Sequence, residues 1–242
     1  MIGVVTATSS IELPKGGATG RRRADQLPGG RHGLSREAVA ESQRDRLLNA
    51  MTVTVGRRGY RDAHITEVVD RAGVSRRTFY EQFEGKEECF AAAYARALEQ
   101  LVATTRAAFD AGDGWAGSLR AGLGALLDAL ALRPEVARVC FVEILAAGPQ
   151  AAGCRDEAMR GFLPLFESAP TDVPRTMRIF ESLGMGRIAD LSEVLHREVA
   201  AGRAAELPAL LPELTYMMVL PFLGPEAAAK ELERGTAREA AA

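Results

Sequence analysis

This sequence lacks an uninterrupted hydrophobic run long enough to cross a membrane. Its longest apolar stretch runs from Leu214 to Leu223 and is interrupted by Thr215 and Pro221. That stretch covers about half of the ~20 residues that a membrane helix needs. The opening residues, MIGVVTATSS, contain neither a basic segment nor a sustained apolar one, which argues against a secretory signal. We therefore expect a cytoplasmic protein that does not associate with a membrane.

Cysteine is scarce, and the signatures of metal binding and catalysis are missing. The cysteines form an odd, widely spaced set, which is typical of a reducing compartment: Cys89, Cys140 and Cys154. The histidines are isolated and lack metal-ligand spacing such as HExxH: His32, His64 and His196. No GxSxG or GxxxxGK[ST] motif occurs. We expect no catalytic residue, no metal and no cofactor, and an enzyme is the disfavoured class.

The small net charge of −2 hides an asymmetry along the chain. Residues 1–86 contain 15 Lys and Arg against 10 Asp and Glu, whereas the remainder contains 15 against 22. A basic first third suits a polyanionic partner, and an acidic remainder suits a different task.

Both ends of the chain are predicted to lie outside the folded core. Residues 1–34 are rich in Gly, Arg, Ser and Thr, and they contain too little apolar surface to offset the entropy of ordering. We interpret them as a disordered arm. Its residues Arg21–Arg23 either touch DNA or, as we favour, remain solvated. Residues 226–242 are interpreted as a polar C-terminal tail.

Between the ends, the apolar periodicity predicts an all-α fold. Short helices are expected over about 65–72 and directly after Ser75, and a long helix is expected from Lys86 to about Phe109. Gly and Pro residues delimit the later helices. These are expected over residues 115–132, 134–147, 150–166, 175–201 and 209–223.

The segment from His64 to Phe90 has the pattern of a helix-turn-helix. Gly73 supplies the positive φ that the tight turn needs, and Val74 fills the space between the two helices. Ser75 is a good N-cap for the second helix. Arg76 and Arg77 follow at the end of that helix that enters a major groove, where their forked donors suit a guanine edge or a phosphate.

The turn and its flanks, AGVSRRTFYEQFEGKEE, resemble the signature of the TetR family of bacterial regulators. The segment AAELPALLPELTYMMVLPFLGPEAA resembles the dimerising last helix of many members. This resemblance implies a helix-turn-helix DNA-binding domain of the homeodomain-like, three-helix type over residues 35–86. It also implies a helical bundle for ligand sensing and dimerisation over residues 87–225.

The resemblance also implies which residues contact DNA. Positions that commonly bind phosphates are occupied here by Ser75, Thr78, Tyr80 and Lys86. Arg76, Arg77 and Phe79 occupy positions that contact the DNA bases in the family, although Phe79 suits core packing equally well. His64 departs from the family pattern, because Thr usually caps the first helix of the motif at that position. His64 either caps that helix or donates to a phosphate, and Thr66 follows two residues later.

The acidic remainder is expected to hold a ligand pocket and a dimer interface. Large apolar residues expected to enclose the pocket are Phe109, Trp115, Phe141, Ile144, Met159, Phe162, Phe166 and Phe180. Residues 207–223 are apolar around nearly the whole helix, so a partner subunit is expected to cover them through a two-fold four-helix bundle. The expected interface residues are Leu191, Leu195, Leu214, Met217, Met218 and Phe222.

The sequence therefore predicts a ligand-responsive regulator of transcription. We expect a homodimer that binds a palindromic operator as a repressor and that a small hydrophobic effector releases by moving the long helix. The alternative is a helical small-molecule or lipid-binding scaffold that merely retains the turn motif.

Overall fold

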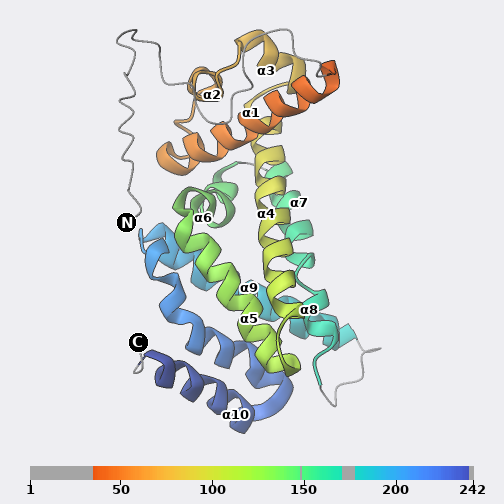
Figure 1. The fold of residues 1–242 in the computed structure, drawn as a ribbon, viewed down its shortest axis with the longest axis vertical. Helices are drawn as coiled ribbons and strands as arrows, with labels where there is room; N and C mark the ends of the chain where they lie inside the picture. The colour runs from red at the N-terminus through yellow and green to blue at the C-terminus, as the bar shows by residue number, and fades with distance from the viewer. Residues whose placement is uncertain (1–34, 148, 171–177, 240–242) are drawn as a thin grey trace, which may run out of the picture. The chain divides into compact units, whose positions relative to one another are not determined.

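The computed structural model describes residues 35–147, 149–170 and 178–239. The predicted N-terminal arm lies outside the described residues. Within them the helices are joined by turns and loops and no strand is present, which confirms the predicted all-α class (Figure 1). The helices in chain order are α1 (Arg36–Arg58), α2 (Ile65–Ala72), α3 (Arg76–Gln82), α4 (Lys86–Asp110), α5 (Gly114–Leu132), α6 (Pro134–Phe141), η1 (Glu143–Ala146), α7 (Pro149–Arg160), α8 (Pro164–Glu167), α9 (Arg178–Ala200), η2 (Ala204–Leu210) and α10 (Leu211–Glu239).

Helices α1–α3 form a small bundle at one end of the described chain (Figure 1). Ser35 caps α1 by accepting a hydrogen bond from the Ala38 N–H, and Gly59 ends α1 at a φ of 88°. The inward face of α1 buries Leu47, Met51 and Val55 completely. These side chains pack with residues of α2 and α3 into the core that gives the small bundle its shape.

Helix α4 runs from the small bundle into the larger helical body (Figure 1). Its N-terminal half is tied to α1, because Arg96 of α4 donates to the Asp45 carboxylate at 3.0 Å. Further along, Leu98, Leu101 and Thr105 recur at helical spacing and are buried. One continuous helix therefore reaches both parts of the molecule.

Two expected helices of the body are divided in the structure. The segment expected over 134–147 separates at Val142 into α6 and η1, and the one expected over 150–166 becomes α7 and α8. Pro164 begins α8 and lacks the N–H that a continuous α-helix would use at that position. After these divisions, α6, α7 and α8 each contribute residues to the lining of an interior cavity.

The C-terminal segment differs from the predicted polar tail. α10 extends through Glu239, with a local break at Gly224, whose φ is 79°. Beyond that break, Ala228 and Glu231 are buried. The Arg120 guanidinium on α5 donates to the Glu231 carbonyl at 2.7 Å, and Arg234 donates to the Glu231 carboxylate at 2.8 Å. The segment is helical because one of its faces docks on α5, a contact that its polar composition does not reveal.

Candidate functional site

The turn between α2 and α3 is held by local caps and by one side chain from α1. Gly73 adopts the left-handed conformation (φ 65°, ψ 40°), as the sequence predicts. Ser75 caps α3, because its hydroxyl accepts a hydrogen bond from the Thr78 N–H at 3.0 Å. Arg46 of α1 donates to the carbonyls of Ala72 at 2.8 Å and Gly73 at 3.3 Å. Sequence reasoning missed Arg46, which fixes the turn against α1.

Helix α3 presents an exposed polar face and a buried aromatic one. Arg76 and Arg77 are exposed, and Tyr80 is 49% exposed. In the free protein, Arg77 Nε donates to the Glu81 carboxylate at 2.8 Å, and the Arg76 guanidinium lies 5.9 Å from the centre of the Tyr80 ring. Arg76, Arg77 and Tyr80 form the exposed polar face of the second helix of the motif.

Phe79 belongs to the core, which corrects its expected place among the base-reading residues. Its side chain is fully buried, and its ring centre lies 5.7 Å from that of Phe83. The two phenylalanines are four residues apart and therefore share the inward face of the segment. Phe79 positions α3 against α1 and α2 without reaching its exposed face.

A cationic groove lies between the start of α2 and the start of α4. Its lining includes His64, Thr66, Arg76 and Lys86. His64 precedes α2 without a side-chain capping hydrogen bond, so its predicted capping role is not realised. The Lys86 ammonium donates to the carbonyls of Tyr60 at 2.8 Å and Ala63 at 3.1 Å. The N-terminus of α2 and these basic groups together suit an anionic oxygen such as a phosphate.

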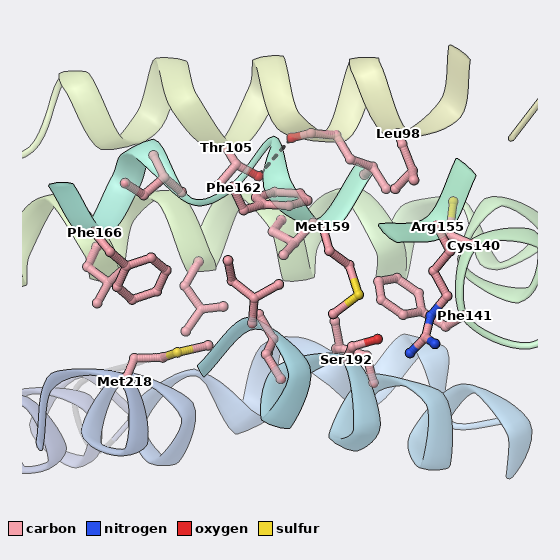
Figure 2. A pocket seen from close by; sticks show the side chains of 18 of the residues that line it. Leu98, Thr105, Cys140, Phe141, Arg155, Met159, Phe162, Phe166, Ser192 and Met218 are labelled. Carbon is pink, nitrogen blue, oxygen red and sulfur yellow. Dashed lines mark hydrogen bonds between the residues drawn. The ribbon is translucent and has the colours of Figure 1, made fainter. Parts of the chain in front are cut away.

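A largely apolar cavity lies in the helical body between α4, α5, α7 and α9 (Figure 2). It comprises about 780 Å³ of atom-free space, part of which opens to solvent. The lining residues come mainly from the inward faces of these helices: Tyr94, Leu98, Leu101, Thr105, Leu119, Leu123, Leu126, Cys140, Phe141, Arg155, Met159, Phe162, Leu165, Phe166, Ile188, Leu191, Ser192, Leu195 and Met218. The Thr105 hydroxyl already donates to the Leu101 carbonyl at 2.7 Å.

The structure brings half of the predicted pocket residues to this cavity. Four of them line it: Phe141, Met159, Phe162 and Phe166. Trp115 lies behind the lining, where its indole N–H donates to the Leu165 carbonyl at 3.0 Å and its ring packs on Phe166 and Phe222. Phe109 packs in the same cluster as Trp115, and Ile144 is buried in the main core. The Phe180 side chain lies outside the described part of the chain.

Sequence reasoning missed most of the lining because it selected large aromatic residues. The face that α4 turns to the cavity consists of Tyr94, Leu98, Leu101 and Thr105, which recur at intervals of three and four residues. That periodicity was a usable signal for a buried face. The periodicity does not distinguish a helix face that packs on another helix from one that lines a cavity.

Cys140 lines the cavity as a protonated thiol. Burial raises the pKa of Cys140 to about 12, and it raises the pKa of Cys89 to about 12 as well. Both thiols therefore lack the thiolate character that oxidant sensing requires at neutral pH.

The small bundle of α1–α3, called the DNA-facing bundle below, meets the cavity wall along a line of contact between α1 and α6, which we call the seam. Gly56 allows close approach, because an added Cβ would stand 2.6 Å from the Glu135 backbone. At the other end of the seam, the buried Glu143 carboxylate accepts hydrogen bonds from the Tyr60 N–H at 2.8 Å and from Arg138 at 2.6 Å. Glu143 follows Phe141 of the cavity lining by two residues. The seam therefore joins the cavity wall to the loop whose carbonyls hold Lys86.

Of the residues predicted to form a dimer interface, Leu191 and Met217 stay predictions and the others require correction. Four of them are buried within this single chain: Leu195, Leu214, Met218 and Phe222. Leu191 and Met217 are partly buried against the chain's own cores. A helix that is apolar on every side does not disclose which side its own subunit covers. The large apolar side chains that α10 leaves exposed are Leu220 and Leu232, each 36% exposed.

Comparison with known proteins places this geometry in a family. Residues 47–93, from α1 into α4, match the model described as bacterial regulatory proteins of the tetR family. A curated relative, the HTH-type transcriptional activator FasR of Mycolicibacterium smegmatis, is 30% identical over 134 residues. That match spans 55% of this chain and 61% of the relative, which is less than two thirds of the relative's length.

Solved structures share the fold beyond the matched segment. The fatty acid degradation regulator FadR of Bacillus halodurans aligns with a TM-score of 0.63 at 19% identity, covering 72% of this chain and 97% of its own. FadR of Bacillus subtilis, solved in complex with stearoyl-CoA, aligns with a TM-score of 0.61 at 17% identity and the same two coverages. The family comprises regulators and not enzymes, in agreement with the sequence prediction. The helix-turn-helix and its matching family model identify residues 47–93 as the DNA-binding segment of the TetR family of bacterial regulatory proteins, and the helical body shares the fold of the solved structures.

Proposed function

We propose that the protein is a DNA-binding regulator of transcription whose affinity for its operator is set by an acyl-bearing effector in the cavity. The observation that carries the proposal is the course of α4. This helix begins at Lys86 in the cationic groove and lines the cavity with Leu98, Leu101 and Thr105. A ligand that displaces α4 in the cavity would also move the start of the helix at the DNA-facing groove.

The geometry of the small bundle supports DNA binding. Exposed Arg76 and Arg77 stand at the N-terminal end of α3, where side chains reach base edges, and Tyr80 offers a hydroxyl to a phosphate. The groove at His64, Thr66 and Lys86 offers a second phosphate position. Because the DNA of a bacterium lies in its cytoplasm, the proposal places the protein there.

The cavity supports an effector with a long apolar chain. Nearly all lining side chains are aliphatic, aromatic or sulfur-containing, so the hydrophobic effect favours an extended hydrocarbon there. The Bacillus subtilis FadR of the same fold was solved with stearoyl-CoA. An acyl thioester of this kind is the effector class that we propose.

A homodimer is supported by the apolar surface near the C-terminus. The segment Ala204–Arg234 is long and apolar enough to cross a membrane by composition alone, with a mean hydropathy of 1.4, yet only 39% of its most apolar stretch is buried. It is broken at Gly224 and packs on α5, which suits a helix of the bundle instead of a membrane span. We propose that a second copy covers its remaining apolar side, through Leu220 and its neighbours. The two-fold symmetry then requires a nearly palindromic operator.

The test is selection of DNA from a random library by the purified protein, followed by titration of the selected site. We expect salt-sensitive, sequence-selective binding that dodecanoyl-CoA changes by at least about tenfold. Release by the effector supports the predicted repressor, whereas tightened binding supports an activator, as FasR is named. A protein that selects no sequence contradicts the regulator, and selective binding that is insensitive to acyl compounds contradicts the effector class.

A further inference from the structure

The polar groups of the cavity gather at one end. Figure 2 shows the Arg155 guanidinium beside Phe141 and Ser192, away from Phe166 and Met218. Among the described residues that line the cavity, Arg155 of α7 is the one with a formal charge. The lining is therefore amphipathic along its length, with a cationic end near the C-terminus of α6 and an apolar end near α8 and α10.

Arg155 is placed to bind an anion. Its side chain is half-buried, and no salt bridge or hydrogen bond joins it to another side chain in the described part of the chain. A guanidinium that borders apolar surface loses part of its hydration, and an anionic oxygen restores the lost interactions through parallel N–H donors. The Ser192 hydroxyl lies on the facing helix α9 and offers an additional hydrogen bond.

The opposite end offers no comparable polar group. Phe166, Leu165, Leu119 and Met218 supply hydrocarbon and a thioether, and the Thr105 hydroxyl donates its proton to the Leu101 carbonyl. A polar head placed at that end would lose its hydrogen bonds to water without replacement. The two ends therefore orient an amphiphilic ligand in one direction.

We propose that Arg155 is the specificity-determining residue that binds the anionic head of the acyl effector, while the chain lies towards Phe166 and Met218. This inference rests on the proposed function and names the chemistry that the cavity selects: a long hydrocarbon chain that carries a carboxylate or a phosphate at one end. An uncharged chain of the same length fills the apolar part and leaves Arg155 without its partner.

The orientation places the charged head next to the seam with the DNA-facing bundle. Phe141, beside Arg155, has its carbonyl held by His196 Nδ1 at 2.7 Å. Two residues further, Glu143 accepts the Tyr60 N–H. The head of the ligand is therefore nearer than its chain to the contacts that dock α1, and charged ligands should switch operator binding more strongly than uncharged ones.

The experiment measures binding of three twelve-carbon probes by calorimetry: dodecanoate, dodecanoyl-CoA and 1-dodecanol. The variants are Arg155→Leu, Arg155→Lys and, as a matched control, Arg160→Leu at the exposed end of the same helix. We expect Arg155→Leu to weaken binding of the charged probes by about tenfold or more and to leave 1-dodecanol unchanged. Arg155→Lys should retain part of the affinity, and Arg160→Leu should match the unmodified protein.

The pattern of loss identifies the source of the anion. Loss confined to dodecanoate indicates a free carboxylate, and loss confined to dodecanoyl-CoA indicates the phosphates of the coenzyme; either supports the proposal. Equal losses for all three probes, or unchanged affinities in Arg155→Leu, overturn it while leaving the acyl effector intact. Failure of all three to bind the unmodified protein would instead overturn the proposed effector class. Thermal melts of each variant establish that it is folded.

Discussion

The DNA-facing bundle and the cavity region are stabilised in different ways. In the bundle, Ser75, Arg46 and Lys86 each make hydrogen bonds of defined geometry to the turn or to backbone carbonyls, around a completely buried Phe79. The cavity region is held mostly by apolar contact and contains unfilled space. Directional contacts and dense packing admit few arrangements, whereas side chains that border a space lose little when they move. We infer that the DNA-facing bundle keeps its shape and that the cavity region changes shape when a ligand binds.

The largest expected effect tests the packing side of this comparison. Phe79→Ala should lower the free energy of unfolding by about 3–5 kcal/mol, because the densely packed bundle cannot close around the lost ring. Phe162→Ala at the cavity should cost on the order of half as much, because that ring already borders empty space. Chemical denaturation of both variants measures the difference. Equal costs would show that the two regions are equally well packed.

A second prediction concerns the link between the two regions. Glu143→Gln should weaken both hydrogen bonds of the seam and destabilise the protein by about 1–3 kcal/mol, because Arg138 loses its anionic partner. The ratio of operator affinities with and without effector should also fall towards one.

The matched control for the seam is Arg57→Ala. It breaks the exposed pair between Arg57 and Glu135, which is expected to contribute only about 0–1 kcal/mol. A Glu143 variant that keeps the full effector response would show that the regions communicate through α4 alone.

A third prediction separates two contacts on α3. Arg77→Ala should weaken operator binding by about 1–3 kcal/mol and relax the preference at one base pair, because a base-edge contact is lost. Tyr80→Phe should weaken all sequences about equally, because a phosphate contact carries no sequence information. Quantitative binding to a panel of single-base operator variants distinguishes them. An Arg77 variant with unchanged selectivity would refute its base-reading role.

The smallest expected effect concerns one buried cysteine thiol in each region, and we expect neither thiol to react with a disulfide reagent. Because burial raises the pKa of Cys89 and of Cys140 to about 12, their thiolates form only as the pH approaches that value. A disulfide reagent at pH 8 should therefore leave both thiols unmodified in the folded protein and label the half-buried Cys154 slowly. All three should react in denaturant. Rapid labelling of Cys140 would mean that the cavity opens more readily than its packing indicates.

Much of the local structure was predictable because its causes are local. The left-handed Gly73, the Ser75 cap and the start of α6 at Pro134 each depend on residues within one turn of the chain. The division of the expected helix at Val142 and the continuation of α10 past Gly224 were not predictable in this way. Both depend on contacts with distant helices, such as that between Arg120 and Glu231.

The candidate functional residues also divide into those with local causes, which the sequence placed, and those that depend on distant contacts, which it did not. Arg76, Arg77 and Tyr80 were placed correctly on an exposed face because the recognition helix follows directly from the turn motif. Leu195, Leu214, Met218 and Phe222 were assigned to an interface yet fill the chain's own core. Hydrophobicity identifies a surface that must be buried, but it does not show whether the chain's own helices or a second subunit bury it.

The amino-acid sequence by itself determined the all-α class and the helix-turn-helix, because short-range periodicity, capping and turn chemistry encode them, and the residues of that motif resemble the TetR family. Only the tertiary structure decided that Phe79 is core, that Glu143 joins the cavity wall to Tyr60, and that Arg155 stands at one end of an apolar space. Those relations join residues far apart in the chain. They arise from how helix faces pack against one another, which no single stretch of sequence specifies.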